Sequence, residues 1–192
     1  MKKRIAITGG IGSGKSSVLH YFAELGYPTF SCDEIYREVI LSPAYIKKIN
    51  EVFPTCVIDG KIDRKILANI VFENKENLSI LNGIAHPLIL NRLLEKMNTC
   101  QNQIVFAEVP LLFEGNFENN FDVVIVVMRK KEERISAIMQ RDQITREEAV
   151  SRISSQFDYD RGDDHFKKCN AILLYNDSSP ADLKLLVEKL DF

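Results

Sequence analysis

Long hydrophobic runs and an excess of one charge are both missing from this sequence of 192 residues. No stretch approaches the ~20 consecutive apolar residues that a membrane helix needs. The apolar run after the basic start, residues 5–7, is too short for the core of a signal peptide. The formal net charge is only -2, which gives no reason to expect a nucleic acid or an anionic membrane as partner. The sequence therefore predicts a cytoplasmic protein with neither kind of partner.

Cysteine is also scarce. The four cysteines are scattered, without a CxxC pair or a nearby histidine cluster: Cys32, Cys56, Cys100 and Cys169. This spacing supports neither a disulfide framework nor a zinc site, and we expect reduced, buried thiols. With 45% hydrophobic and 27% charged residues, the composition fits one globular domain.

Five short apolar runs predict β-strands. They cover residues 4–8, 27–32, 103–107, 122–128 and 171–175. Apolar runs without alternation are typical of strands that are covered on both faces, as in a parallel sheet. Helical patterns fill the intervals. The predicted fold class is therefore α/β, a three-layer arrangement around a five-stranded parallel sheet.

Helix starts are predicted from capping residues as well as from apolar spacing. The start signals are Ser42-Pro43, Asp63, His86-Pro87, Thr145 with Glu148, and Ser179-Pro180. Roughly seventy residues separate the second and third predicted strands, and all of them look helical in pattern. A plain crossover needs only about a dozen. We expect this insert, about 34–100, to cap the edge of the sheet where open α/β folds bind ligands.

Residues 9–16 read Gly-Gly-Ile-Gly-Ser-Gly-Lys-Ser and match the phosphate-loop pattern GxxxxGK[ST] between a predicted strand and a predicted helix. Glycines let successive amide N–H groups approach phosphates, and the helix N-terminus adds partial positive charge. Lys15 would reach the β- and γ-phosphates, and Ser16 would supply a hydroxyl to Mg²⁺. The sequence therefore predicts ATP and Mg²⁺ as cofactors.

A phosphate loop alone does not separate kinases from nucleotide switches. A GTPase would need an Asn-Lys-x-Asp motif, and the nearest stretch, residues 74–77, reads Asn-Lys-Glu-Asn. We expect this stretch to cap a helix instead. An ATP-driven motor would need larger domains. A small kinase is the favoured interpretation.

Two carboxylates follow predicted strands at the edge where the phosphate loop lies. Asp33 could accept a proton from an attacking hydroxyl or hold a metal-bound water; alternatively, it caps the helix expected at 34–40. Arg37, one turn later, could pair with Asp33 or meet a substrate phosphate. Glu108 ends the third strand and suits a role in organising Mg²⁺, the alternative being a carboxylate in solvent.

The stretch 129–161 is dense in charge. Its basic residues are Arg129, Lys130, Lys131, Arg134, Arg141, Arg146, Arg152 and Arg161. Phosphoryl-transfer enzymes need mobile cations that close over the γ-phosphate. A charge-rich helix pair is more often a solvated face with i,i+4 ion pairs, and from the residues alone we favour that interpretation for each arginine.

Taken together, several segments resemble the dephospho-coenzyme A kinase family. The phosphate loop has the family's form, and Asp33 falls on the second aspartate of its Asp-Ala-Asp…Arg segment. The other matching elements are His86-Pro87, residues 108–114 (Glu-Val-Pro-Leu-Leu-Phe-Glu), the lid residues Gln140-Arg141-Asp142, Thr145 to Glu148 and Gln156, and Asn176 after the fifth strand. The resemblance runs from the first strand to the last.

The resemblance implies a P-loop kinase that transfers the γ-phosphoryl group of ATP to the ribose 3′-hydroxyl of 3′-dephospho-coenzyme A, giving coenzyme A and ADP. It implies one domain, 1–192, with an acceptor-binding insert at about 34–100 and a lid at about 129–161; we expect a monomer. Asp33 would be the general base, and Lys15 and Arg141 would stabilise the transferred group. The implied ATP site is Gly9, Gly12, Ser13, Gly14, Lys15, Ser16, Ser17 and Asn176. The implied acceptor site is Arg37, His86, Pro110, Leu111 and Glu114, and the implied metal ligands are Ser16 and Glu108.

The sequence departs from the family pattern at several positions. Ser31 replaces the first aspartate, Ala137 stands where a lid arginine is common, residues 169–170 and Tyr175 replace Ala-Asp and Asp, and Ser178 replaces a glycine. A weaker lid, altered Mg²⁺ handling or slower turnover are compatible with these changes. Two other functions stay open: another P-loop small-molecule kinase, acting on a nucleoside or nucleotide, and a non-catalytic ATP-binding regulator.

Overall fold

The computed structural model describes residues 2–72 and 74–192, and the chain forms two compact units. The sheet unit comprises Met1–Phe30 and Cys100–Phe192, and the helical unit comprises Ser31–Thr99. The chain therefore leaves the sheet unit after the second strand and returns to it before the third, as an insert does.

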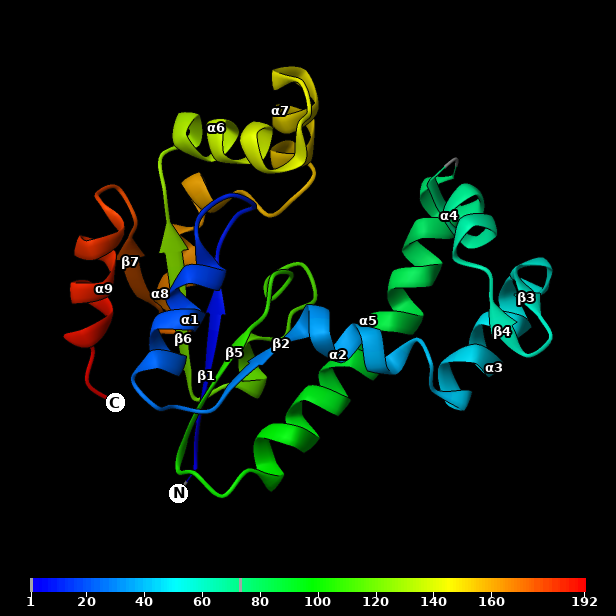
Figure 1. Cartoon of the computed structure of the whole chain (residues 1–192), viewed down its shortest axis with the longest axis horizontal. Helices are drawn as coiled ribbons and strands as arrows, with labels where there is room; N and C mark the ends of the chain where they lie inside the picture. Colours follow the sequence, from blue (N-terminus) through cyan, green and yellow to red (C-terminus); the bar gives the residue numbers. More distant parts are fainter. Residues whose placement is uncertain (1, 73) are drawn as a thin grey trace. The chain divides into compact units, whose positions relative to one another are not determined.

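The sheet unit is built on a five-stranded parallel sheet with the order β2-β5-β1-β6-β7 (Figure 1). Its strands are β1 (Lys3–Thr8), β2 (Thr29–Ser31), β5 (Ile104–Glu108), β6 (Val123–Met128) and β7 (Ile172–Tyr175). The central strand β1 pairs in parallel with β5, where Ile5 faces Phe106, and with β6, where Ile5 faces Val123. This confirms the predicted fold class, and the predicted strands lie within a few residues of the observed ones.

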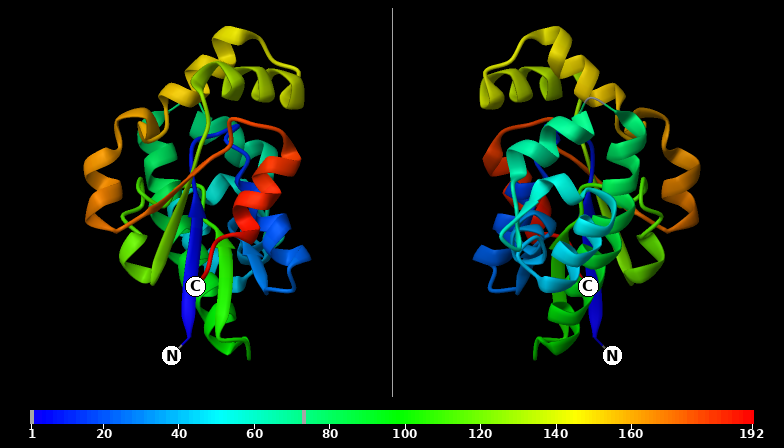
Figure 2. Two further views of the ribbon diagram at one scale, coloured as in Figure 1. Left: turned by 90° about the vertical axis from the view of Figure 1, so that its left-hand side faces the viewer. Right: turned by 90° about the vertical axis from the view of Figure 1, so that its right-hand side faces the viewer.

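Helices cover both faces of the sheet. The helices of the sheet unit are α1 (Lys15–Glu24), α6 (Lys131–Asp142), α7 (Arg146–Ser154), α8 (Asp163–Lys168) and α9 (Pro180–Glu188), with the 3-10 turns η2 (Glu118–Asn120) and η3 (Tyr159–Arg161). Helices α6 and α7 lie beyond the ends of the strands (Figure 1). Figure 2 shows α1 and α9 on one side of the sheet and α8, in orange, on the other. The start of α7 is the expected capping box between Thr145 and Glu148.

The core under α1 determines where the phosphate loop lies. Phe22 of α1 stacks on Phe106 of β5 with 3.8 Å between ring centroids, and both rings are buried together with Val18 and Ile125. Burial of this apolar surface and the aromatic contact fix the helix against the sheet. The loop that joins β1 to α1 is therefore held at the carboxyl edge of the central strand.

The helical unit surrounds the long helix α5. Its elements are α2 (Cys32–Val39), α3 (Pro43–Val52), η1 (Pro54–Cys56), β3 (Val57–Ile58), β4 (Lys61–Ile62), α4 (Arg64–Phe72) and α5 (Lys75–Thr99). Helices α2, α3 and α4 all pack against α5. Ser42 caps α3, with Pro43 in its first turn, and Asp63 Oδ1 accepts hydrogen bonds from the N–H groups of Lys65 and Ile66. These two caps confirm the predicted helix starts.

The helical unit differs from the sequence prediction in two places. The insert is not helical throughout, because β3 and β4 form an antiparallel hairpin around Asp59 and Gly60. Both residues have positive φ, 50° and 73°, as the tight turns of two-residue hairpins require. His86-Pro87 does not open a helix either. Helix α5 begins at Lys75 and runs through Pro87, and buried Ala85, Leu93 and Met97 on both sides of the proline pack it in place.

The four cysteines are free, as expected, but only Cys56 is buried. The prediction of buried thiols is wrong for Cys32, Cys100 and Cys169, which are half-buried. Across residues 2–72 and 74–192, no helix combines the length and the apolarity that crossing a membrane requires.

Candidate active site

The loop from Gly9 to Gly14 joins β1 to α1 and has the geometry of a phosphate cradle. Gly9, Gly12 and Gly14 have positive φ of 144°, 79° and 98°, which a side chain would disfavour. A Cβ on Gly9 would also lie 2.4 Å from the carbonyl oxygen of Val127. Gly14 serves as the N-cap of α1 without a side-chain cap. The N–H groups of Lys15 and Ser16 at the start of α1 are therefore placed to meet an anion, while the N–H of Ser17 donates to the carbonyl oxygen of Gly14 at 3.1 Å.

Lys15 begins α1 and folds back over the loop. Its side chain is nearly buried, at 8% exposure for the residue. Its Nζ donates hydrogen bonds to the carbonyl oxygens of Gly9, at 2.9 Å, and Gly10, at 3.1 Å. This arrangement holds one positive charge at the cradle, where a triphosphate would need it.

Ser16 and Glu108 meet beside the cradle. Ser16 Oγ donates to Glu108 Oε1 at 3.1 Å, because Glu108 ends β5 opposite Ile7 of the central strand. Glu108 is only 9% exposed, so the alternative of a carboxylate in solvent is wrong. A hydroxyl and a carboxylate are oxygen ligands that suit Mg²⁺.

The number of protein ligands at this place also suits Mg²⁺. No group of three or more His, Cys, Asp or Glu side chains among the described residues could hold a metal on its own. Magnesium in phosphoryl-transfer sites takes one or two protein oxygens and fills its octahedron with phosphate oxygens and water. The pair of Ser16 and Glu108 therefore fits a metal ion that arrives with a nucleotide.

Two further groups of the predicted ATP site lie at the loop. Asn176, directly after β7, donates from Nδ2 to the carbonyl oxygen of Ser13 at 2.8 Å. The Oγ of Ser13 is buried and has no hydrogen-bond partner within the described part of the chain. Burying a hydroxyl without a hydrogen-bond partner costs free energy. This is consistent with a hydroxyl that forms its hydrogen bond to a bound ligand. Ser17 is exposed on the first turn of α1.

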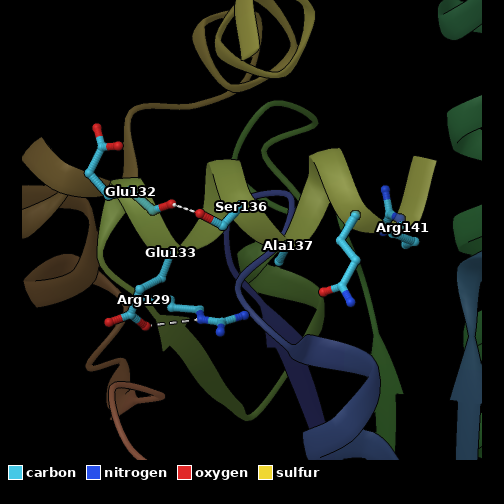
Figure 3. Close-up of a pocket in the computed structure, with 7 residues that line it drawn as sticks. Arg129, Glu132, Glu133, Ser136, Ala137 and Arg141 are labelled. Atoms are coloured by element: carbon cyan, nitrogen blue, oxygen red, sulfur yellow. Dashed lines mark hydrogen bonds and ion pairs between the residues drawn. The ribbon is translucent and has the colours of Figure 1, made fainter. Parts of the chain in front are cut away.

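An open cavity of about 520 Å³ lies along α6 (Figure 3). Its lining residues all come from the predicted lid: Arg129, Glu132, Glu133, Ser136, Ala137, Gln140 and Arg141. Arg129 Nε pairs with Glu133 Oε2 at 3.2 Å, and Ala137 lies one turn further along α6. Arg141 pairs with the neighbouring Asp142 through Nε at 2.7 Å. Arg141, predicted as catalytic, thus lines the same cavity as Arg129, whose Nη1 donates to the carbonyl oxygen of Gly12 in the phosphate loop.

Asp33 and its neighbours belong to the helical unit. Ser31 is the N-cap of α2, and its Oγ accepts the N–H of Asp33 at 3.2 Å. Asp33 is thus the second residue of the helix and not its cap, so that alternative is wrong. Asp33 and Arg37 are both exposed, and no ion pair joins them in the part of the chain that the structure describes. His86 is half-buried on α5.

The remaining predicted acceptor residues follow β5 in the sheet unit. Pro110 and Leu111 are half-buried and Glu114 is exposed. Glu114 Oε1 accepts the N–H of Phe157 at 2.8 Å, and Phe113 packs its ring 4.9 Å from that of Phe157. Glu114 therefore has a structural contact with the end of the lid segment.

Comparison with known proteins gives a consistent result. The dephospho-CoA kinase family model matches residues 3–182. A dephospho-CoA kinase of Fusobacterium nucleatum is 37% identical over 187 residues, which is 96% of this chain and 95% of the relative. One from Bacillus cereus is 42% identical over 159 residues, 79% of each chain. The solved structure of dephospho-CoA kinase from Campylobacter jejuni has a TM-score of 0.71 and 35% identity, covering 98% of this chain and 95% of that one.

This chain belongs to the dephospho-CoA kinase family. The resemblance found in the sequence is thereby confirmed, together with its P-loop kinase fold. Membership in the dephospho-CoA kinase family implies ATP as the phosphoryl donor.

Sequence reasoning missed two arginines of this dephospho-CoA kinase family member. Arg129 and Arg134 were assigned to a solvated face, yet Arg129 Nη1 donates to the carbonyl oxygen of Gly12 at 3.2 Å. Arg134 is only 3% exposed, and its Nε donates to the carbonyl oxygen of Ile11 at 3.0 Å. The available signal was helical spacing, because Arg134 lies one turn before buried Ile138 and shares its face.

The environment of Arg134 is unusual for a guanidinium. Burial lowers the pKa of Arg134, and the nearby carboxylate of Asp160 works against this shift. A guanidinium remains protonated in proteins all the same. By contrast, Arg146 and Arg152 form exposed ion pairs with Glu132 and Asp142, as the solvated-face interpretation predicts.

Proposed function

We propose that this chain transfers the γ-phosphoryl group of ATP to the ribose 3′-hydroxyl of 3′-dephospho-coenzyme A and releases coenzyme A and ADP. The observation that supports this most strongly is the phosphate cradle of Gly9–Gly14 with Lys15 and the Ser16–Glu108 pair, in a chain that belongs to the dephospho-CoA kinase family. Four free cysteines are consistent with the reducing cytoplasm as its location.

The ATP site would be formed by the loop and the residues around it. The N–H groups of Gly12, Gly14, Lys15 and Ser16 would face the β- and γ-phosphates, and the Ser13 hydroxyl would gain the partner it lacks. Lys15 would exchange its carbonyl contacts for phosphate oxygens. Asn176 would hold the loop from the side of β7.

Ser16 and Glu108 would hold Mg²⁺, Ser16 with its hydroxyl and Glu108 with its carboxylate directly or through water. When bound, the metal ion neutralises charge on the β- and γ-phosphates. The fold places these two ligands side by side, because the pairing of β1 with β5 brings Glu108, at the end of β5, beside the first turn of α1.

Asp33 would accept the proton of the ribose 3′-hydroxyl as its oxygen forms the new bond to the γ-phosphorus and the bond to the ADP oxygen breaks. The carboxylate is suited to this because Ser31 caps α2, so Asp33 has no capping bond to give up. Arg141 and Lys15 would stabilise the charge on the transferred group. Arg37, His86, Pro110, Leu111 and Glu114 would contact the acceptor.

The test combines one substrate assay with a matched pair of variants. The purified chain is given Mg·ATP and 3′-dephospho-coenzyme A as the sole acceptor, and coenzyme A is measured. We expect Asp33→Asn to lower kcat by about 10²- to 10⁴-fold while ATP binding, measured by calorimetry, stays within about threefold. Glu34→Gln, next to it and also exposed on α2, is the control and should keep full activity.

Three results would contradict the proposal in different ways. Turnover with nucleosides but not with 3′-dephospho-coenzyme A would indicate another small-molecule kinase. ATP binding without turnover on any acceptor would indicate a regulator. An unchanged kcat in Asp33→Asn would remove Asp33 from the role of base and leave the activity itself standing.

A further inference from the structure

We propose that Arg129, Arg134 and Asn176 form a collar that holds the phosphate loop in its binding conformation before ATP arrives. They would act as positioning residues, because they bond the loop and not the phosphates. The proposal rests on the proposed function only in that the loop binds the phosphates of ATP.

The collar is visible in three hydrogen bonds to three successive carbonyl groups. Arg134 Nε donates to Ile11 at 3.0 Å, Arg129 Nη1 to Gly12 at 3.2 Å, and Asn176 Nδ2 to Ser13 at 2.8 Å. The donors come from three places in the fold: α6, the segment after β6, and the segment after β7. No single helix packing can explain all three contacts.

These three contacts fix the direction of the loop's N–H groups, because each C=O and the N–H that follows it belong to one rigid peptide group. In a trans peptide the C=O and the following N–H point in opposite directions. Holding the carbonyls of residues 11–13 toward the collar therefore turns the N–H groups of residues 12–14 to the other side of the chain. The N–H of Ser13 is turned in this way and donates across the loop to the carbonyl oxygen of Gly10 at 3.1 Å, so the N–H groups that would meet an anion are those of Gly12 and Gly14. Convergent N–H groups of this kind form an anion-binding nest.

Arg134 is the residue of the collar whose burial is hardest to explain by stability alone. It is buried, and no ion pair of its guanidinium is found among the side chains that the structure describes, although the carboxylates of Asp160 and Asp158 are near enough to act on its pKa. Burying a cation without a paired carboxylate is costly. Its positive charge thus lies beside the loop uncancelled by a direct partner, where it would also favour the arrival of a polyanion.

Gly10 gives independent evidence for the same contact. A Cβ on Gly10 would lie 2.1 Å from Arg134 Nη2 and 2.4 Å from its Cζ. Gly10 is not among the residues with positive φ, so its backbone would accept alanine. The guanidinium, and not the backbone, is therefore what excludes a side chain at this position.

The first experiment measures ATP affinity and stability in the full-length chain. Calorimetry with ATP, thermal unfolding, and steady-state kinetics with both substrates are applied to Arg129→Met, Arg134→Met and Arg134→Lys. We expect each Met variant to weaken ATP binding and raise the KM for ATP about ten- to hundredfold, since a loop that is no longer held must be ordered on binding. The KM for 3′-dephospho-coenzyme A should stay within about threefold, and Arg134→Lys, which keeps one donor, should recover part of the loss.

The matched control is Arg161→Met, which removes an arginine of the same segment whose side chain is 88% exposed. It should change ATP affinity less than twofold. An Arg134→Met variant that loses stability while those molecules still folded bind ATP as the wild type does would show a merely structural role and overturn the proposal. So would equal ATP affinity in all variants. Failure of the wild type to bind ATP would instead contradict the proposed function.

The second experiment is a double-mutant cycle between Gly10 and Arg134. Gly10→Ala alone should weaken ATP binding at least tenfold, because the new methyl group displaces the guanidinium. In the Arg134→Ala background the same Gly10→Ala change should cost less than twofold. Additive effects of the two changes would show that Arg134 does not occupy the space above Gly10, and the collar would be wrong.

Discussion

Replacing Lys15 by methionine tests the electrostatic part of the site with little change in shape. The two side chains have similar length, so Lys15→Met removes the charge and keeps most of the apolar stem. In the structure the ammonium is nearly buried and bonds the carbonyl oxygens of Gly9 and Gly10. The change therefore removes one cation at the place where the phosphates of ATP would bind.

The expected loss of activity follows from the charge. A cation about 4 Å from a phosphate oxygen, at an effective dielectric constant of about 20, contributes about 4 kcal/mol. Allowing for partial compensation by Mg²⁺, we expect a loss of about 3–4 kcal/mol, which is two to three orders of magnitude in kcat/KM.

Stability should respond differently. Gly9 and Gly10 each lose a donor, which costs about 1–3 kcal/mol for a buried acceptor. Removal of a buried charge offsets part of this cost. A change of only a few degrees in Tm is therefore expected.

The assay is coenzyme A formation under saturating Mg²⁺, with thermal unfolding measured in parallel. Lys168→Met, at an exposed position of α8, serves as the control and should leave both quantities unchanged. A Lys15→Met variant that keeps kcat/KM within tenfold of the wild type would refute the assignment of this ammonium to the phosphates. A large drop in Tm would indicate that Lys15 mainly supports the fold of the loop.

Two further predictions concern the metal pair and the pH dependence of stability. Glu108→Gln keeps the bond from Ser16 but removes the negative charge, and it should raise the Mg²⁺ concentration for half-maximal activity about tenfold or more, measured by titration at fixed ATP; an unchanged titration would exclude Glu108 as a metal partner. Partial burial acts to raise the pKa of Asp122, but hydrogen bonds from the backbone N–H and the guanidinium of Arg4 more than offset it, and the pKa is lowered. Because the unfolded-state pKa is about 3.9, this contribution to stability is complete above that pH and is lost as the pH falls through the lower folded-state pKa. Asp122→Asn should therefore lose stability at pH 7 and show a shallower decline toward pH 2 in urea unfolding, and parallel pH profiles would contradict the assignment.

The sheet could be predicted from the sequence because its central strands β1, β5 and β6 are largely buried. The five predicted runs agree with the observed strands because β-branched, apolar segments such as Val123–Met128 allow few other structures. The Asn-Lys-Glu-Asn stretch was also interpreted correctly: Asn74 Oδ1 accepts the N–H of Glu76 at 2.8 Å and so caps α5. A helix cap involves residues only two or three positions apart, so it can be predicted from the sequence.

The hairpin of the helical unit was missed although its turn signal was present. Asp59-Gly60 is a typical two-residue hairpin turn, but each flanking strand has only two residues, Val57–Ile58 and Lys61–Ile62. Such short strands carry no periodicity. The continuation of α5 through Pro87 was also missed, because a proline usually ends a helix and only tertiary packing shows that this one does not.

The residues of the candidate site also fall into two groups: those that local sequence patterns predict and those that only tertiary contacts reveal. The glycine loop, Lys15 and Ser16 were found from spacing, because their chemistry lies in eight consecutive residues. The contacts of Arg129 and Arg134 with the loop join residues more than one hundred positions apart, and a charged helix face looks the same whether it meets water or a backbone carbonyl. Only the return of β6 beside β1 brings them to the loop.

One residue of the loop is attached to both ends of the lid segment. Ile11 donates its N–H to Gln156 Oε1 at 2.7 Å and receives the bond from Arg134 at its carbonyl oxygen. The N–H and the C=O of Ile11 belong to two neighbouring peptide groups, so a shift of either group would strain a contact to one of two residues that lie twenty-two positions apart (156 − 134). The two backbone groups of Ile11 thus tie the position of the phosphate loop to α6 and to the segment that follows α7.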